Sequence, residues 1–208
     1  MPAGRPKSLD PADALPTIVR MFWRGGYDGS TLDQIATELG VTKPTLCRTL
    51  GDKEAIFAAA LEAYHREHIE PAERYLDQAE TLCEALEAVF GLFAERTLTA
   101  ELPDGCFMGD SGSSGDFVAG PIAATLNALQ DRLVASVQGR VTCALAEGEL
   151  ESSTEPTMVV QYLLGQFAAI SAISRVQPSR TELLSVVGYM LDGLPWANTQ
   201  RHDRQDQR

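Results

Sequence analysis

The chain has 208 residues, of which 44% are hydrophobic and 22% charged, and its formal net charge is −12. That length is sufficient for one or two domains with a real hydrophobic core. No apolar run has the length of a membrane span, and no secretory leader is recognisable before the first expected helix. We therefore expect a soluble cytoplasmic protein that has no membrane partner.

The charge is divided unevenly along the chain. Residues 1–53 hold seven Lys and Arg and six Asp and Glu, a balance of +1, whereas residues 54–208 hold ten and twenty-three, a balance of −13. DNA repels an acidic body, so only the N-terminal part is suited to dock on a duplex. The alternative is that the acidic part simply keeps the protein in solution.

The N-terminal segment begins with a short basic arm, residues 1–8, whose Arg5 and Lys7 can reach a minor groove or a phosphate. We expect this arm to be disordered without DNA. The first helix is predicted from Leu9 to Gly25, with a bend or delayed start at Pro16. Its buried side comprises Ile18, Val19, Phe22 and Trp23.

Two short helices joined by a tight turn follow between Thr31 and Lys53. Thr31 and Gln34 fit a capping box at the start of the first, and Gly40 ends it with the left-handed conformation that glycine tolerates. Thr42 can cap the second helix. This spacing is typical of a helix-turn-helix, in which the second helix enters a major groove.

The open side of the second short helix carries small and basic residues. Asp52 can cap the next helix and leave Lys53 in its first turn, where the charge and free N–H groups can meet a phosphate. The alternative is an ordinary helical hairpin with a polar surface. The residues predicted to face DNA are Thr31, Thr42, Lys43, Pro44, Thr45, Cys47, Arg48, Thr49 and Lys53.

The rest of the chain is also predicted to be helical. A long helix is expected from Ala55 to Tyr75, with a kink at Pro71. On this helix His65 and His68 are spaced as metal ligands can be. The favoured interpretation is nevertheless that they belong to a solvated charged face. Further helices are expected over residues 79–100 and 117–147. Between them lies a Gly- and Ser-rich loop with at most one short helix, at Cys106 to Asp110.

The last two helices are predicted over 155–176 and 179–194. The first is apolar nearly all round, so it must be buried on more than one side, and its length together with Gln161 and Gln166 argues against a membrane span. Paired with their copies, these helices form a four-helix homodimer interface. The alternative is that they are the core of one subunit.

Residues 9–61 resemble the DNA-binding domain of TetR-type transcriptional repressors. The matching pieces are FWRGGYDGSTLDQIATELGV and TKPTLCRTLGDKEAIF, and the remaining chain resembles the family in helical layout and length. Family members usually carry Tyr at the position of Cys47, often an aromatic residue at Thr49, and Phe at Leu50. Because a thiol is a poor hydrogen-bond donor, we expect one phosphate contact per subunit to be missing or supplied by Arg48.

The resemblance implies an all-α protein with an N-terminal three-helix DNA-binding domain and a C-terminal helical domain for ligand binding and dimerisation. The implied divisions are a flexible arm at 1–8, the DNA-binding domain at 9–61, the ligand and dimerisation domain at 62–194 and a disordered tail at 195–208. It further implies a dimeric repressor that a small apolar or aromatic effector releases from a palindromic operator. The predicted ligand-binding residues are Phe90, Phe93, Phe107, Met108, Phe117, Tyr162 and Phe167.

Two other functions stay open. Cys83, Cys106 and Cys143 with Met108 can bind a soft metal or react with an oxidant, and an exposed Cys47 can be oxidised, which predicts a thiol- or metal-responsive regulator. The changed residues at 47, 49 and 50 also allow a helical interaction protein with weakened DNA binding. The wide spacing of the four cysteines predicts reduced thiols. No enzyme motif is present, so no catalytic residue and no cofactor is expected.

Overall fold

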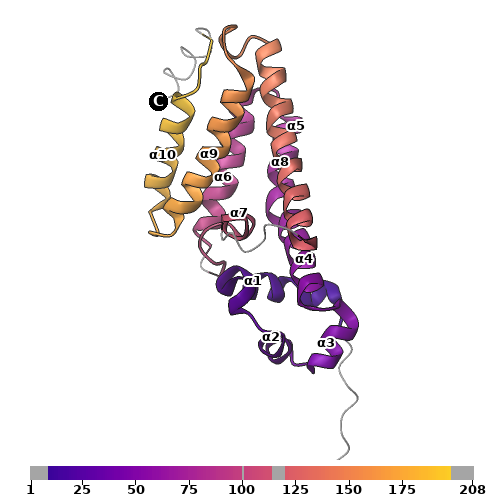
Figure 1. Ribbon diagram of the computed structural model, residues 1–208. Coiled ribbons are helices and arrows are strands. Elements are labelled where there is room, and N and C mark those ends of the chain that lie inside the picture. The colour runs from indigo at the N-terminus through magenta and orange to yellow at the C-terminus, as the bar shows by residue number, and fades with distance from the viewer. Residues whose placement is uncertain (1–8, 100, 114–119, 198–208) are drawn as a thin grey trace, which may run out of the picture. The chain divides into compact units, whose positions relative to one another are not determined.

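A computed structural model describes residues 9–99, 101–113 and 120–197. Within these ranges the regular structure is helical, apart from an isolated antiparallel bridge between Leu150 and Trp196, so the prediction of an all-α fold is confirmed. The elements are α1 (Pro11–Gly29), α2 (Leu32–Glu38), α3 (Lys43–Leu50), α4 (Lys53–Tyr64), the π-helical turn η1 (His65–Ile69), α5 (Glu70–Gln78), α6 (Leu82–Thr97), α7 (Phe107–Ser113), α8 (Pro121–Ala146), α9 (Pro156–Ser174) and α10 (Arg180–Asp192) (Figure 1).

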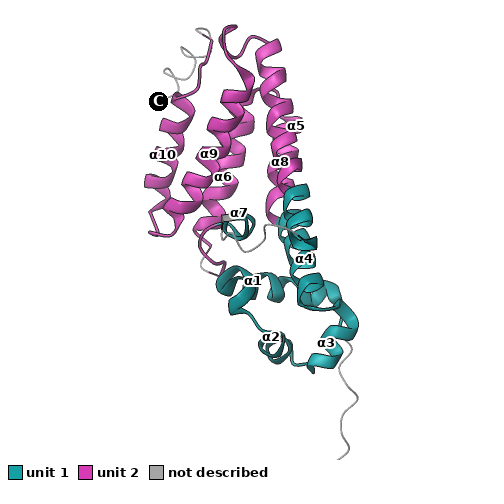
Figure 2. Cartoon of the chain, in the orientation of Figure 1, with its two compact units in different colours: residues 1–67, 106–129 teal, residues 68–105, 130–208 magenta. Residues whose placement is uncertain are grey.

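The chain divides into two compact units (Figure 2). The head unit comprises residues 1–67 and 106–129, and the body unit comprises residues 68–105 and 130–208. Packing therefore groups α7 and the start of α8 with the N-terminal helices, although the sequence places them in a C-terminal domain that begins at residue 62. The division of α8 between the units falls after Leu129.

The core of the head unit is built from aromatic rings. Helix α1 packs on α2, α4 and α7, and α3 packs on α2 and α4. The rings of Phe22 and Phe57 meet edge to face with centroids 4.8 Å apart, and Trp23 meets Tyr64 in the same way at 5.0 Å. Phe107 of α7 contacts both Phe57 and Tyr64, at 5.3 and 5.6 Å. Edge-to-face contacts of this kind stabilise a core beyond the apolar area that they bury.

Local signals in the sequence set the helix ends of the head unit. Thr31 and Gln34 form the predicted capping box, and the side chains of Thr42 and Asp52 accept hydrogen bonds from the backbone at the starts of α3 and α4. Gly26 interrupts α1 with φ 67°, where glycine has no steric penalty. Pro16 lies inside α1 in its regular first part, so the expected delay of the helix start is absent.

The predicted single helix from Ala55 to Tyr75 is wrong in detail, because the π-helical turn separates α4 from α5. Pro71 lacks the N–H that would bond the carbonyl of Glu67, and its ring crowds that carbonyl. The backbone widens immediately before this position. The expected solvated face is also wrong for His65, whose side chain is only 1% exposed.

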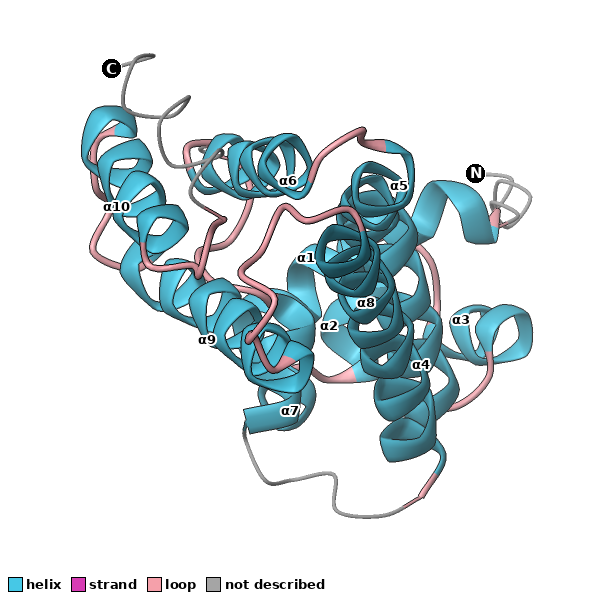
Figure 3. Ribbon diagram, turned by 90° about the horizontal axis from the view of Figure 1, so that it is seen from above, coloured by secondary structure: helices cyan, strands magenta, loops and turns pink. Residues whose placement is uncertain are grey.

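In the body unit, helix α6 packs against α5, α9 and α10, and it lies between α5 and α10 in Figure 3. Its buried side carries Leu82, Leu86, Val89 and Phe90, all without exposed surface. These residues recur at intervals of three and four, the period that places them along one helix face. Burying this face against three neighbours holds the body unit together.

A buried polar network lies at one end of the body unit. Glu149 accepts a hydrogen bond from the backbone N–H of Leu82 at 2.7 Å and is paired with Arg140, and both charged side chains are buried. Arg140 also reaches Glu147 at 3.3 Å. Burial is the main cause that raises the pKa of Glu149, and the Leu82 N–H and Arg140 oppose it.

The same network ties down the last described segment. The N–H of Ala197 donates to the carbonyl of Glu149, and the N–H of Glu151 donates to that of Pro195, both at 2.9 Å. Trp196 is buried, and its indole N–H donates to the carbonyl of Leu191 at 2.7 Å. Residues 195–197 are therefore part of the folded body unit, whereas the sequence predicts a disordered tail from residue 195.

Candidate nucleic-acid interface

Helix α3 presents its predicted DNA-facing residues on one side. Leu46 is fully buried and Leu50 half-buried, so the opposite face of the helix is turned outward. Thr45 and Cys47 are half-buried, which leaves less of the Cys47 thiol open than the sequence predicts. The exposed members of the predicted set are Thr31, Thr42, Lys43, Pro44, Arg48 and Thr49, and Lys53 is half-buried.

Lys43, in the first turn of α3, forms an ion pair with Asp33 of α2. The Nζ–Oδ2 distance is 2.9 Å, and the two side chains are 48% and 71% exposed. A pair as exposed as this contributes about 0–1 kcal/mol, because water and salt screen it. Lys43 can therefore exchange Asp33 for a phosphate at little cost.

Lys53, the first residue of α4, is placed differently. Its Nζ lies 4.3 Å from the centroid of the Tyr27 ring, a cation–π contact. Within the described residues it has no ion pair. Tyr27 is absent from the residues predicted to serve the interface, and no local pattern marks it, because 26 positions separate it from Lys53.

Arg48 lies in the last turn of α3, where a cation interacts favourably with the helix dipole. Its side chain is exposed, and in the described part of the chain it has no ion-pair partner. Arg48 is therefore the cation on this helix that needs to break no ion pair in order to reach DNA. That Arg48 supplies the phosphate contact expected to be missing at Cys47 stays a prediction.

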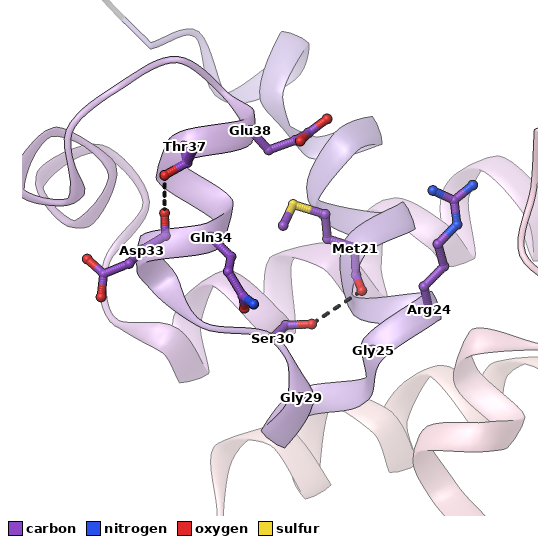
Figure 4. Close-up of a pocket in the computed structure, with 9 residues that line it drawn as sticks. All are labelled: Met21, Arg24, Gly25, Gly29, Ser30, Asp33, Gln34, Thr37 and Glu38. Carbon is purple, nitrogen blue, oxygen red and sulfur yellow. Dashed lines mark hydrogen bonds between the residues drawn. The ribbon is translucent and has the colours of Figure 1, made fainter.

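A surface hollow of about 640 Å³ lies between α1 and α2 (Figure 4). Inside it the Ser30 hydroxyl donates to the Met21 carbonyl at 3.2 Å, and the Thr37 hydroxyl donates to that of Asp33 at 2.8 Å. A Cβ at Gly25 would lie 2.8 Å from Ser30 Oγ, so glycine allows this close approach. The Ser30 hydrogen bond and the glycine at position 25 thus hold in place the turn that precedes Thr31. The hollow is lined by Met21, Arg24, Gly25, Gly29, Ser30, Asp33, Gln34, Thr37 and Glu38.

The predicted ligand-binding residues fall in two groups. Phe107 and Met108 are buried in the head unit, where Phe107 packs on Phe57 and Tyr64. In the body unit, Phe167 meets Phe90 at 4.9 Å and Phe93 at 5.4 Å, and the Arg96 guanidinium lies 4.6 Å from the Phe93 ring. Phe117 lies outside the described residues.

Tyr162, also in the body unit, borders a separate hollow of about 430 Å³ between the start of α9 and residues 193–195. Its hydroxyl donates to the Met190 carbonyl at 2.7 Å, and burial raises the pKa of Tyr162. Tyr162 therefore joins α9 to α10 and is not among the ring contacts of Phe90, Phe93 and Phe167. The prediction that all these residues bind one ligand stays a prediction.

The four cysteines are free. Cys143 is exposed and the other three are half-buried. Cys106 belongs to the head unit, whereas Cys83 and Cys143 belong to the body unit. Among the described residues, no three His, Cys, Asp or Glu side chains are grouped as metal ligands would be.

Helices α9 and α10 expose apolar side chains. Met158 of α9 is 66% exposed and Tyr189 of α10 is 78% exposed, and Val176, just after α9, is also 78% exposed. Gly165, Ala168 and Ala172 lie on the exposed side of α9. Among the described helices, α9 also has the length and apolar composition that crossing a membrane requires, a test that the core helices of soluble proteins pass too.

Comparison with known proteins identifies the N-terminal part of the chain. Residues 15–60 match the model for bacterial regulatory proteins of the tetR family. The chain is 29% identical over 192 residues to the HTH-type transcriptional repressor ComR of Escherichia coli, covering 90% of each sequence. It is also 33% identical over 61 residues, 29% of this chain and 31% of the other, to an uncharacterized HTH-type regulator, YezE, of Bacillus subtilis.

Solved structures share the fold. The TetR-family regulator CifR, solved with double-strand operator DNA, superposes with a TM-score of 0.79 at 23% identity, covering 92% of this chain and all of that one. FadR of Bacillus subtilis, solved with stearoyl-CoA, gives 0.71 at 16% identity, covering 89% and 98%. The helix-turn-helix geometry, the matched family model and these relatives lead to one conclusion: residues 15–60 form a helix-turn-helix DNA-binding domain of the tetR family of bacterial regulatory proteins.

Proposed function

We propose that the chain is a cytoplasmic homodimeric repressor that binds a palindromic operator and is released from it by a small apolar or aromatic molecule. The observation that carries the proposal is helix α3, whose exposed Lys43 and Arg48 stand on a helix held from behind by the buried Leu46. A helix of this length reads only a few base pairs, so a specific site needs a second copy. ComR, which is similar along most of its length, is described as a repressor.

The exposed faces of α9 and α10 support the homodimer. Three large apolar side chains there are more than half exposed, and small residues on α9 allow a second helix to approach closely. A two-fold axis would pair the faces with their copies in a four-helix arrangement and would present two α3 helices to successive half-sites. A Tyr189→Arg substitution on this face should give a monomer that keeps its fold and loses specific DNA binding.

The rings of Phe90, Phe93 and Phe167 support an apolar or aromatic effector. They form a cluster of apolar rings beside the Arg96 cation in the body unit, the kind of side chains that line ligand sites. Release from DNA requires only that the effector bind the conformation with low operator affinity more tightly than the other. Such coupling is commonly ~1–3 kcal/mol, or about 5- to 150-fold in operator affinity.

A pull-down of genomic fragments with the purified protein, repeated at rising salt, tests the proposal. Recovery of one palindromic site, lost with Tyr189→Arg and weakened with Arg48→Ala, is the expected result. Compounds suggested by the neighbouring genes are then screened for release of that site. Recovery of no fragment above background at any salt concentration would exclude a specific regulator and favour the helical interaction protein.

A second candidate, a thiol-responsive regulator, is favoured by the surroundings of Cys106. The Tyr64 hydroxyl lies 3.4 Å from its sulfur and donates to it, and the Gly109 N–H donates at 3.5 Å. Cys106 is half-buried, so it is not enclosed in the core, and a free cysteine that keeps some exposure can react with an oxidant or an electrophile. Alkylation with N-ethylmaleimide, which adds the thiol across the maleimide double bond, should then weaken operator binding by a Cys47→Ser variant and have no effect once Cys106→Ser is added to that variant.

A further inference from the structure

The contact between Lys53 and Tyr27 joins two elements that the chain places far apart. Tyr27 follows the break at Gly26, and Lys53 opens α4. The lysine Nζ is 4.3 Å from the centre of the tyrosine ring, within the range in which an ammonium group is attracted to a π face. Lys53 is half-buried, so part of the residue stays open to solvent.

The Tyr27 ring is itself held in place from behind. It meets Phe57 edge to face with centroids 5.1 Å apart, and Phe57 is fully buried. Phe57 in turn contacts Phe22 of α1 and Phe107 of α7. The ring below Lys53 is therefore anchored in the aromatic core of the head unit, and it forms a fixed platform rather than a loose surface side chain.

Several carboxylates lie near the Tyr27 ring, so the ring is not the only group there that can attract the Lys53 ammonium. Burial is the main cause that raises the pKa of Tyr27, and the negative charges of Glu54, Asp52 and Asp28 raise it further. These acids therefore lie close enough to act on the site. Within the described residues Lys53 is paired with none of them, whereas Lys43 is paired with Asp33. The ring holds the ammonium group without neutralising it.

We propose that Tyr27 is a positioning residue for DNA binding: its ring holds Lys53 where a DNA phosphate meets the start of α4. The inference rests on the proposed DNA-binding role of Lys53. An ammonium group that contacts a ring on one side still has N–H donors for a phosphate on the other. A lysine already held in place loses less side-chain freedom on binding, so a larger fraction of the free protein is ready to bind.

Four variants test the proposal on a mixed-sequence duplex, since phosphate contacts do not depend on sequence. Tyr27→Met removes the ring but keeps an apolar contact with Phe57, and Tyr27→Phe keeps the ring. Lys53→Met removes the charge, and the double variant combines Tyr27→Met with Lys53→Met. Dissociation constants are measured over a series of salt concentrations, with thermal melting to confirm folding.

Lys53→Met should make the fall of log K, the association constant, with log salt concentration less steep, by about 0.9 for each subunit in contact. Tyr27→Met should weaken binding about two- to fivefold per subunit, the factor that corresponds to a cation–π contact of ~0.5–1 kcal/mol. Tyr27→Phe should bind like wild type. In the Lys53→Met background, Tyr27→Met should have no further effect.

An equal loss from Tyr27→Met in both backgrounds would overturn the proposal, because the ring would then act on the fold alone. Tighter binding by Tyr27→Met would also overturn it, because the ring would then compete with the phosphate for Lys53. A wild-type protein with no salt-dependent affinity for any duplex would contradict the proposed function instead. The two failures are therefore distinguishable.

NMR of the wild-type protein gives a second measurement that needs no variant to fold. The ring current of Tyr27 should shift the Cε protons of Lys53 upfield, and this shift should persist when the duplex is added. Loss of the shift on binding would show that Lys53 leaves the ring for the phosphate, which contradicts a positioning role.

Discussion

The head and body units each hold an ion pair between a basic residue and a carboxylate, but the two pairs have opposite surroundings. Lys43 and Asp33 in the head are about half or more exposed, whereas Arg140 and Glu149 in the body are buried. Water screens the first pair, while the second has lost its hydration and depends on its partner. The head thus keeps its charges exchangeable for DNA, and the body uses its charges to fix a loop in place.

The largest difference should come from the same substitution made in each pair. Arg140→Met leaves Glu149 buried without its cation and should cost about 3–5 kcal/mol of unfolding free energy, whereas Lys43→Met should change it by less than about 0.5 kcal/mol. Urea denaturation at neutral pH measures both. Equal losses of unfolding free energy in the two variants would show that the exposure of an ion pair does not decide how much it contributes to stability.

The cost of Arg140→Met should also depend on pH. Because the folded-state pKa of Glu149 is raised, the folded protein binds this proton more tightly, so protonation stabilises it below the unfolded pKa and the stabilisation is lost as pH rises through the folded pKa. Arg140 opposes that rise, so its removal should move the pKa further up. The deficit of the variant should shrink as the pH falls from neutral toward the ordinary pKa of a Glu side chain, about 4.3.

A companion variant sharpens this result. Glu149→Gln removes the charge but keeps an oxygen for the Leu82 N–H, so adding it to Arg140→Met should recover more than half of the lost stability. It should also abolish the pH dependence of the deficit. A double variant as unstable as Arg140→Met would show that the arginine acts through packing rather than through charge.

Matched helix caps should give an intermediate effect. Thr31 begins α2 in the head and Ser179 begins α10 in the body, and each forms a complete capping box. Thr31→Ala and Ser179→Ala should each cost about 1 kcal/mol of unfolding free energy. Only Thr31→Ala should weaken duplex binding at matched stability, because only Thr31 is predicted to face DNA; equal binding by both variants would contradict that prediction.

The smallest effect on stability, with a gain in binding, is expected from Asp33→Asn. The exposed pair contributes at most about 1 kcal/mol, so the melting temperature should scarcely change. Lys43 would no longer have to leave a carboxylate, and affinity for a mixed-sequence duplex should rise about two- to fivefold per subunit. Glu38→Gln, on the same helix, is the control for a general change of charge. Unchanged or weaker binding by Asp33→Asn would show that Asp33 does not compete for Lys43.

The features that the sequence predicts well depend on neighbours a few residues apart. The caps at Thr31, Thr42 and Asp52 and the break at Gly26 follow from side-chain and backbone chemistry within one helical turn. Pro71 predicts an irregularity, but not its form as a π-helical turn. Such signals give the helix order and the open face of α3.

The features that the sequence does not reveal depend on residues far apart in the chain. Glu149 reaches the N–H of Leu82 across 67 positions, and Tyr27 lies under Lys53 across 26. The local sequence around Phe107 is equally compatible with packing on Phe57 of the head and with lining a ligand site in the body. Charge and apolar character show that such residues have partners, but only the fold shows which partners they have.

The burial of Trp196 gives the segment after α10 a structural importance that its polar surroundings hide. A premature stop codon a few positions before 196 would delete a core side chain, its bond to Leu191 and the backbone pairs that close the loop around Glu149. The truncated protein would expose apolar surface of the body unit to proteases while keeping a complete helix-turn-helix. Nonsense alleles there should therefore act through protein turnover rather than through altered recognition of DNA.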